Sequence, residues 1–224
     1  MMLSQHGINS LSRGPKEVFF EFLSSVVAPE TAAHMPKTIK DGVTYEYFDS
    51  DIAQAIYWFD GPISEVEFDV CVGDDVLACD YGIWDVAPVR AHSSFYGTYY
   101  TALIAKFSTA GYDSISFPAY SERNNSYYQE RAAGSPTEYC KSINSSSSAK
   151  YTKPKHYKYE VIDNHNIRVT VTYIDGYSIS RISSILLTYT DTLSLRYIRM
   201  QLEAVRSGRR DEFAFKNFRI LYKG

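Results

Sequence analysis

The stretch "YEVIDNHNIRVTVTYIDGYSISR", residues 159–181, decides the fold class. Its centre alternates apolar residues with polar ones; the apolar set is Ile167, Val169, Val171 and Tyr173, and the polar set is Arg168, Thr170 and Thr172. A period of two with one apolar face is typical of an antiparallel strand that is buried on one side. Asp175-Gly176 then supplies the positive backbone angles that a tight hairpin needs. The stretch therefore predicts two strands around a turn, in an all-β protein.

Further short runs with the same period lie on both sides of this stretch, separated by Gly, Pro, Asp and Asn. They are "VTYEYF" (43–48), "AQAIYWF" (53–59), "ISEVEFDVCV" (63–72), "VLACDYGIW" (76–84), "TYYTALIAKF" (98–107), "SISFPAY" (114–120), "ISSILLTY" (182–189), "TLSLRYIRMQLEAV" (192–205) and "DEFAFKNFRILYKG" (211–224). Many short strands at this spacing predict a sandwich or a barrel. In the last run, the order of its aromatic residues indicates a bulge near Asn217.

The N-terminal segment has a different pattern. In "RGPKEVFFEFLSSVVAPE" the apolar residues recur at three-and-four spacing between Pro15 and Pro29, which predicts a one-sided helix of about three turns. A strand through Val18, Phe20 and Phe22 is the alternative. We expect an arm or helix over residues 1–34 and a single sandwich domain over residues 35–224, with the polar stretch 121–155 as a long loop.

Charge and composition exclude several classes of protein. The net charge is -3, from 26 acidic and 23 basic residues, and the bases are scattered, so nucleic acid is not expected as a partner. We find no run long enough to span a bilayer and no secretory signal, so we expect a soluble product of the cytosol that can still be incorporated in a virion. Three cysteines match no metal or redox spacing; we expect reduced thiols at Cys71, Cys79 and Cys140, with a Cys71–Cys79 bridge as the alternative.

Tyrosine is abundant, with 20 residues in a chain that is 15% aromatic. Tyrosine suits the half-buried surface of a sheet, and it also suits a surface that stacks on sugar rings or anchors a protein interface. On the second interpretation, the candidate ligand-binding residues are Trp84, Tyr96, Tyr99, Tyr100, Arg123, Asn124, Asn125, Tyr127 and Tyr128.

The C-terminal third, residues 156–224, resembles the concanavalin A-like lectin/glucanase and laminin G-like jelly rolls. The resemblance lies in the strand and turn "VTYIDGYSIS" and in the closing run "FAFKNFRILY". It implies a two-sheet antiparallel jelly-roll sandwich, in which the last strand pairs with the first; residues 8–11 would supply that first strand.

The same resemblance draws attention to Glu65, Glu67 and Asp69 in "SEVEFDV", because glucanase-like members carry acids at alternate positions of one strand. Alternation places the three carboxylates on one face. Crowded carboxylates raise one another's pKa, which would suit acid and nucleophile roles. The family order is Glu, Asp, Glu, whereas this strand reads Glu, Glu, Asp, and the usual flanking aromatic residues are absent. A solvated strand face is the alternative.

Lectin-like members often bind calcium through Asp and Asn oxygens on loops. Here "GDD" (73–75) and "DNHN" (163–166) offer such oxygens, but turn formation explains both. We therefore expect no resident metal or cofactor, with calcium as the alternative.

Three functions follow from these patterns, in order. The first is a non-catalytic structural or adhesion protein, oligomeric, such as a phage or virus particle component (capsid decoration, fibre or tail) whose partners are neighbouring protein subunits or surface glycans. The second is a carbohydrate-binding module, and the third is a glycoside hydrolase or polysaccharide lyase that uses Glu65, Glu67 and Asp69.

Overall fold

The structure is a computed structural model. It describes residues 15–73, 75–84, 102–108, 112–116, 118–121, 126–129, 154–163, 166–174, 176, 178–184 and 195–224; between 102 and 129 it describes the backbone alone. The predictions at Tyr96, Tyr99, Tyr100, Arg123, Asn124, Asn125 and Cys140 lie outside these residues.

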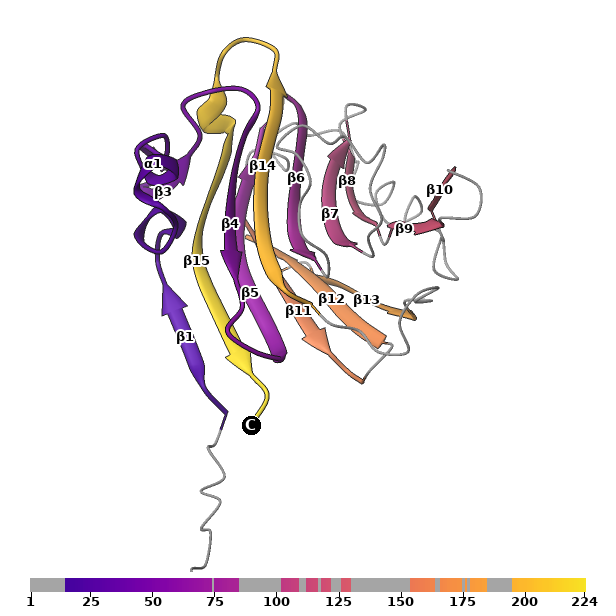
Figure 1. The fold of residues 1–224 in the computed structure, drawn as a ribbon. Helices are drawn as coiled ribbons and strands as arrows, with labels where there is room; N and C mark the ends of the chain where they lie inside the picture. The colour runs from indigo at the N-terminus through magenta and orange to yellow at the C-terminus, as the bar shows by residue number, and fades with distance from the viewer. Residues whose placement is uncertain are drawn as a thin grey trace, which may run out of the picture.

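Two antiparallel sheets make up the sandwich (Figure 1). The larger sheet has the order β13-β12-β11-β5-β15-β3-β2, and β1 pairs with β15 beside this path. Its strands are β1 (Glu17–Phe20), β2 (Lys37–Lys40), β3 (Val43–Tyr47), β5 (Ile63–Val72), β11 (Lys155–Val161), β12 (Asn166–Tyr173), β13 (Ser178–Ser184) and β15 (Phe213–Tyr222).

The smaller sheet has the order β4-β14-β6-β7-β8. Its strands are β4 (Ala53–Trp58), β6 (Val76–Trp84), β7 (Ala102–Ser108), β8 (Tyr112–Ser116) and β14 (Tyr197–Val205). A separate ribbon pairs β9 (Pro118–Ser121) with β10 (Ser126–Gln129), and of these two strands β10 lies inside the stretch 121–155 expected to be a long loop.

The alternating stretch 159–181 contributes to three strands: the end of β11, β12 and most of β13. β12 is the middle strand, with β11 paired on one side and β13 on the other. The apolar face predicted for β12 is confirmed: Ile167, Val169, Val171 and Tyr173 are 0 to 7% exposed. Gly176 has a φ of +83° in the turn between β12 and β13, as the predicted hairpin requires.

The core lies between the two sheets and is rich in aromatic rings. Phe68 of β5 lies at 0% exposure, and its ring centroid is 5.6 to 5.8 Å from those of Tyr157, Tyr159 and Phe218. Across the layers, the hydroxyls of Tyr81 on β6 and Tyr157 on β11 are 2.9 Å apart. Within the described residues, several tyrosines therefore serve the core, and the hydroxyls of Tyr81 and Tyr157 act as polar partners for each other.

β15 contains the predicted bulge. Asn217 has a φ of +55°, and the pairing with β5 shifts between Lys216 and Arg219. On its other side, β15 pairs first with β3 and then, beyond the bulge, with β1. The last strand thus pairs with a first strand, but at Glu17–Phe20; residues 8–11 lie outside the described residues.

The three-turn helix predicted between Pro15 and Pro29 is wrong, and the strand alternative is what the structure contains. After β1 come a 3-10 helix (Leu23–Ser25) and the one-turn α1 (Pro29–Ala32). Backbone pairing with β15 and burial of Phe20 and Leu23 in the core outweigh the helical spacing of the apolar residues.

Two further expectations concern cysteine and the membrane. Cys71 and Cys79 are both buried and are not bonded to each other, so the alternative bridge between them does not form. Within the described ranges, no helix combines the length and the apolar character that crossing a bilayer requires.

Candidate functional site

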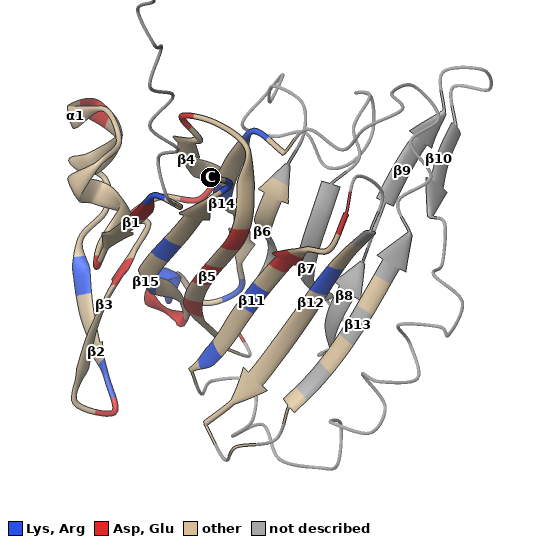
Figure 2. Cartoon of the chain, turned by 90° about the horizontal axis from the view of Figure 1, so that it is seen from below, with Lys and Arg blue, Asp and Glu red and all other residues tan. Residues whose placement is uncertain are grey.

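The three acids predicted from the sequence share one face of β5, as alternation requires. Val66, Phe68 and Val70 point into the core, and Glu65, Glu67 and Asp69 lie on the outer face of the larger sheet. There they meet basic side chains of β11 and β15, so that acidic and basic residues alternate across the strands (Figure 2).

Glu65 lies between two cations. Its carboxylate is 2.5 Å from Arg219 Nη1 and 2.8 Å from Lys158 Nζ. Partial burial acts to raise the pKa of Glu65, but hydrogen bonds from Lys158 and Arg219 outweigh it and hold the pKa below its ordinary value of 4.5. The pKa elevation expected from crowded carboxylates is therefore wrong for Glu65, which stays ionised.

Asp69 has both oxygens engaged. Its Oδ1 is 2.8 Å from His156 Nδ1, and its Oδ2 accepts a hydrogen bond of 2.7 Å from Asn217 Nδ2. The hydrogen bond to Asp69 raises the pKa of His156. The positive φ of Asn217 thus aims its amide at Asp69, which ties the bulge to the charged face. These contacts make the acids part of an ion-pair network in which each carboxylate has a structural partner.

A different set of polar residues lies on the outer face of the smaller sheet. On β14, Ile198, Met200 and Leu202 belong to the core, and the alternating positions face the other way. Those positions hold Tyr197, Arg199 and Gln201, each 0 or 1% exposed. The row is therefore buried, and its phenol, guanidinium and amide groups are placed to make hydrogen bonds within the molecule.

The sequence predictions missed this row, although its signal is present. The run "YIRMQLEAV" alternates polar and apolar residues, and only its strand character was inferred. The register joins the row to one predicted site residue, because Tyr197 is paired with Trp84 on β6 and with Trp58 on β4. Of the other predicted residues, Tyr127 and Tyr128 lie in β10, whose backbone alone is described.

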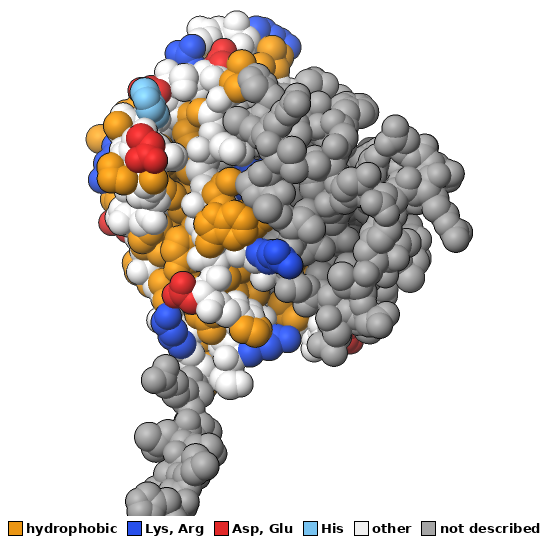
Figure 3. Space-filling view, in the orientation of Figure 1, with side chains coloured by type: hydrophobic (Ala, Val, Ile, Leu, Met, Phe, Trp, Pro, Cys, Tyr) orange, Lys and Arg blue, Asp and Glu red, His pale blue; other side chains and the backbone are white. Residues whose placement is uncertain are grey.

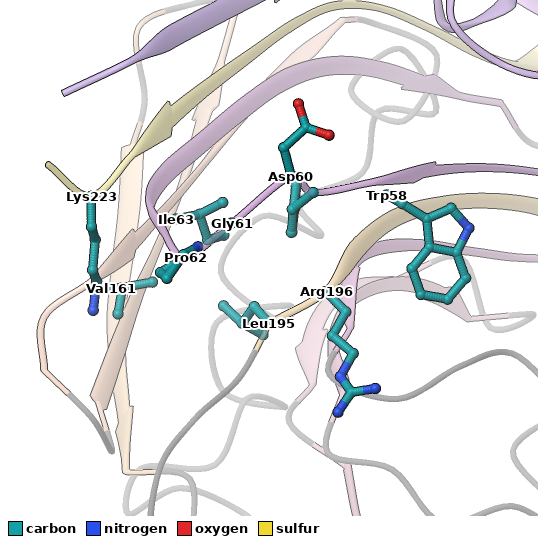
Figure 4. A pocket seen from close by; sticks show the side chains of 10 residues that line it. Trp58, Asp60, Gly61, Pro62, Ile63, Val161, Leu195, Arg196 and Lys223 are labelled. Atoms are coloured by element: carbon teal, nitrogen blue, oxygen red, sulfur yellow. The ribbon is translucent and has the colours of Figure 1, made fainter. Parts of the chain in front are cut away.

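A pocket of about 550 Å³ opens at the Trp58 end of this row. Trp58 is 48% exposed, and its ring lies 4.8 Å from that of Tyr197, which supports it from behind. Figure 4 shows Arg196 and Trp58 on one side of the pocket, Lys223 with Val161 on the other, and Leu195 between them. In the space-filling view, apolar side chains over β4 and β14 adjoin a basic group (Figure 3).

Backbone hydrogen bonds fix the walls of the pocket. The N–H of Phe59 donates to the carbonyl of Arg196 at 2.8 Å, and the N–H of Lys223 donates to the carbonyl of Pro62 at 2.8 Å. The pocket therefore lies where the connection from β4 to β5 meets the start of β14 and the end of β15. It offers an aromatic face with polar and charged groups around it, a combination suited to a sugar ring.

The calcium alternative stays a prediction. Asp74, Asn164 and His165 lie outside the described residues, so neither predicted loop can be judged as a whole. In the part of the chain that the structure describes, no group of three or more His, Cys, Asp or Glu side chains is placed to hold a metal ion.

No family model and no curated protein matches the sequence. Solved structures do match. Lectin II from Ulex europaeus superposes with a TM-score of 0.52 at 11% identity, over 92% of this chain and 97% of the lectin. The architecture is thus that of a concanavalin A-like jelly roll, as the resemblance implied.

Two matches are weaker. The marine PL-14 alginate lyase from Aplysia kurodai gives a TM-score of 0.44 at 8% identity, over 85% of this chain and 87% of the lyase. The CBM2 module of the evolved Dit of Lactobacillus casei BL23 phage J-1 gives 0.44 at 9% identity, over 96% and 94%.

Proposed function

We propose that this protein is a non-catalytic, lectin-like adhesion protein that binds a glycan on the outer face of its smaller sheet. The observation that carries the proposal is the half-exposed Trp58, supported by Tyr197 at one end of the polar row on β14 and bordered by a pocket. The flat face of an exposed indole suits the apolar side of a sugar ring.

The test is glycan binding by the full chain and by Trp58→Ala, measured on a broad glycan array and then by calorimetry. We expect the variant to bind about tenfold more weakly or worse, because a stacked ring and its buried area are lost. Phe19→Ala is the matched control, since Phe19 is also exposed (60%) but lies on β1 of the larger sheet. Equal affinity for both variants would reject Trp58 as the binding residue.

The non-catalytic part of the proposal draws support from the acids. Glu65, Glu67 and Asp69 lie on the outer face of the larger sheet, away from Trp58, and each has a basic or amide partner. We expect the bound glycans to be recovered intact. New oligosaccharides in the supernatant, detected by mass spectrometry and abolished by Glu65→Gln with Asp69→Asn, would instead establish the hydrolase or lyase alternative.

We extend the proposal to assembly: the chain acts as a subunit of a larger structure such as a phage or virus particle. Support comes from β2, an edge strand of the larger sheet whose Ile39 is 71% exposed. An edge strand has backbone groups that can pair with another chain. Native mass spectrometry tests this part, and a strict monomer at all concentrations would count against it.

A further inference from the structure

We infer that the ligand of the Trp58 pocket is an anionic saccharide, a sugar chain that carries carboxylate or sulfate groups. This inference rests on the proposed function and specifies its ligand class. It follows from the balance of charge in the pocket walls.

The pocket contributes two exposed cations, Arg196 and Lys223. Within the described residues, neither Arg196 nor Lys223 forms an ion pair with an acidic side chain. Arg219, Lys158 and Lys216 on the larger sheet each form one. Two cations held at one pocket without counter-charges set up a positive potential there.

Asp60 is the one carboxylate among the residues that line this pocket, and it does not offset the cations. Its Oδ2 is 3.2 Å from Lys16 Nζ, so a third basic residue already balances it. Figure 4 shows the carboxylate of Asp60 directed away from Arg196 and Lys223.

Both cations have fixed backbones. The carbonyl of Arg196 accepts a hydrogen bond from the Phe59 N–H, and the N–H of Lys223 donates to the carbonyl of Pro62, each at 2.8 Å. These bonds fix the backbone positions of the two basic residues on opposite walls of the pocket. A guanidinium binds a carboxylate or sulfate through two parallel hydrogen bonds, and such charged hydrogen bonds are about twice as strong as neutral ones. A neutral sugar would offer these two groups hydroxyl acceptors alone, which lack the charge that strengthens a hydrogen bond to a carboxylate or sulfate.

The geometry divides the work between the residues. Trp58 covers a ring face, Arg196 beside it receives an acidic group of the same or the adjoining sugar, and Lys223 on the far wall receives the next. A ligand with regularly spaced negative charges, such as a uronic acid chain, therefore fits better than one with a single charge.

The experiment compares oligomers of galacturonate, glucuronate, mannuronate and guluronate, each with a neutral twin made by reducing its carboxyl groups, and sulfated oligosaccharides with desulfated twins. Binding to the full chain is measured by calorimetry at low and high salt. We expect at least one acidic oligomer to bind and its neutral twin to bind at least about tenfold more weakly. Added salt should weaken the complex with the acidic oligomer.

Arg196→Gln and Lys223→Gln should each remove this preference for the acidic twin. Lys37→Gln is the matched control, because Lys37 is an exposed cation on β2 of the other sheet and should leave binding unchanged. Circular dichroism confirms that each variant is folded.

The failures are distinguishable. If neutral twins bind as well as acidic ones and Trp58→Ala abolishes both, the anionic ligand is wrong and the proposed glycan site stands. If no glycan of either kind binds, both the inference and the proposed function are overturned.

Discussion

Replacement of Glu65 by glutamine distinguishes a structural acid from a catalytic one. The change keeps the shape of the side chain and removes the charge that lies between Lys158 and Arg219. If the carboxylate acts only within the charged face of the larger sheet, the variant loses stability and nothing else.

The expected loss follows from the partners that remain. Arg219 keeps Glu17 at 3.1 Å and Lys158 keeps Glu67 at 3.6 Å, so neither cation is left alone. The Glu65 side chain is 16% exposed, which places the pair between a surface ion pair, worth about 0 to 1 kcal/mol, and a buried one whose rupture costs about 3 to 5 kcal/mol. We expect a loss of about 1 to 2 kcal/mol in the free energy of unfolding. For a chain of this size, that lowers the Tm by about 2 to 8 °C.

Urea unfolding of the wild type, Glu65→Gln and Glu17→Gln measures this loss. Glu17 serves as the control, because it pairs with the same Arg219 but is 52% exposed and should cost less than about 1 kcal/mol. Acid removes the difference: since the pKa of Glu65 is lowered, its contribution is complete above the ordinary value of 4.5 and disappears as the pH falls through the folded value. A variant with unchanged stability that has lost a polysaccharide-cleaving activity would refute the structural role.

Three other substitutions test the fold. As the pH rises above 6.5, His156→Gln should lose less stability than the wild type. Asp69 raises the pKa of His156 in the folded state, so the charged imidazole stabilises the wild type at low pH and this stabilisation disappears as the pH rises through the raised pKa. Urea unfolding at a series of pH values measures the difference. Phe68→Ala should cost about 3 to 5 kcal/mol in urea, because three aromatic rings border the cavity it leaves. Gly73→Ala should cost about 1 to 3 kcal/mol in the same assay, because a new Cβ would lie 2.9 Å from the Cβ of Glu212.

The strands were predictable because their pattern is local. Runs such as 63–72 and 76–84 became strands with those bounds, since alternation over several residues needs only one apolar face and one polar face. The N-terminal helix failed for the opposite reason. Spacing between Pro15 and Pro29 suits a helix, but β1 forms through contact with a strand about 200 residues later, which local spacing cannot reveal.

The candidate site was predictable only in part, because it depends on which strands become neighbours. Periodicity placed Glu65, Glu67 and Asp69 on one face, but it did not place Lys158, His156 and Arg219 opposite them. Two of these partners, Lys158 and Arg219, reverse the expected pKa shift of Glu65. The Trp58 pocket combines residues from distant parts of the chain, including Arg196 and Lys223. Strand order brings them together, and strand order is invisible to periodicity.

The positions of β14 and β15 have a consequence for synthesis. β14 lies between β4 and β6 in one sheet, and β15 lies between β5 and β3 in the other, so the two latest strands each separate earlier ones. Neither sheet can close until residues 197–222 have emerged from the ribosome, and pairings across such long chain separations form slowly. We therefore expect the earlier strands of the nascent chain to expose their apolar faces and unpaired edges until then. Such chains are prone to aggregate, and chaperones are expected to bind them during synthesis.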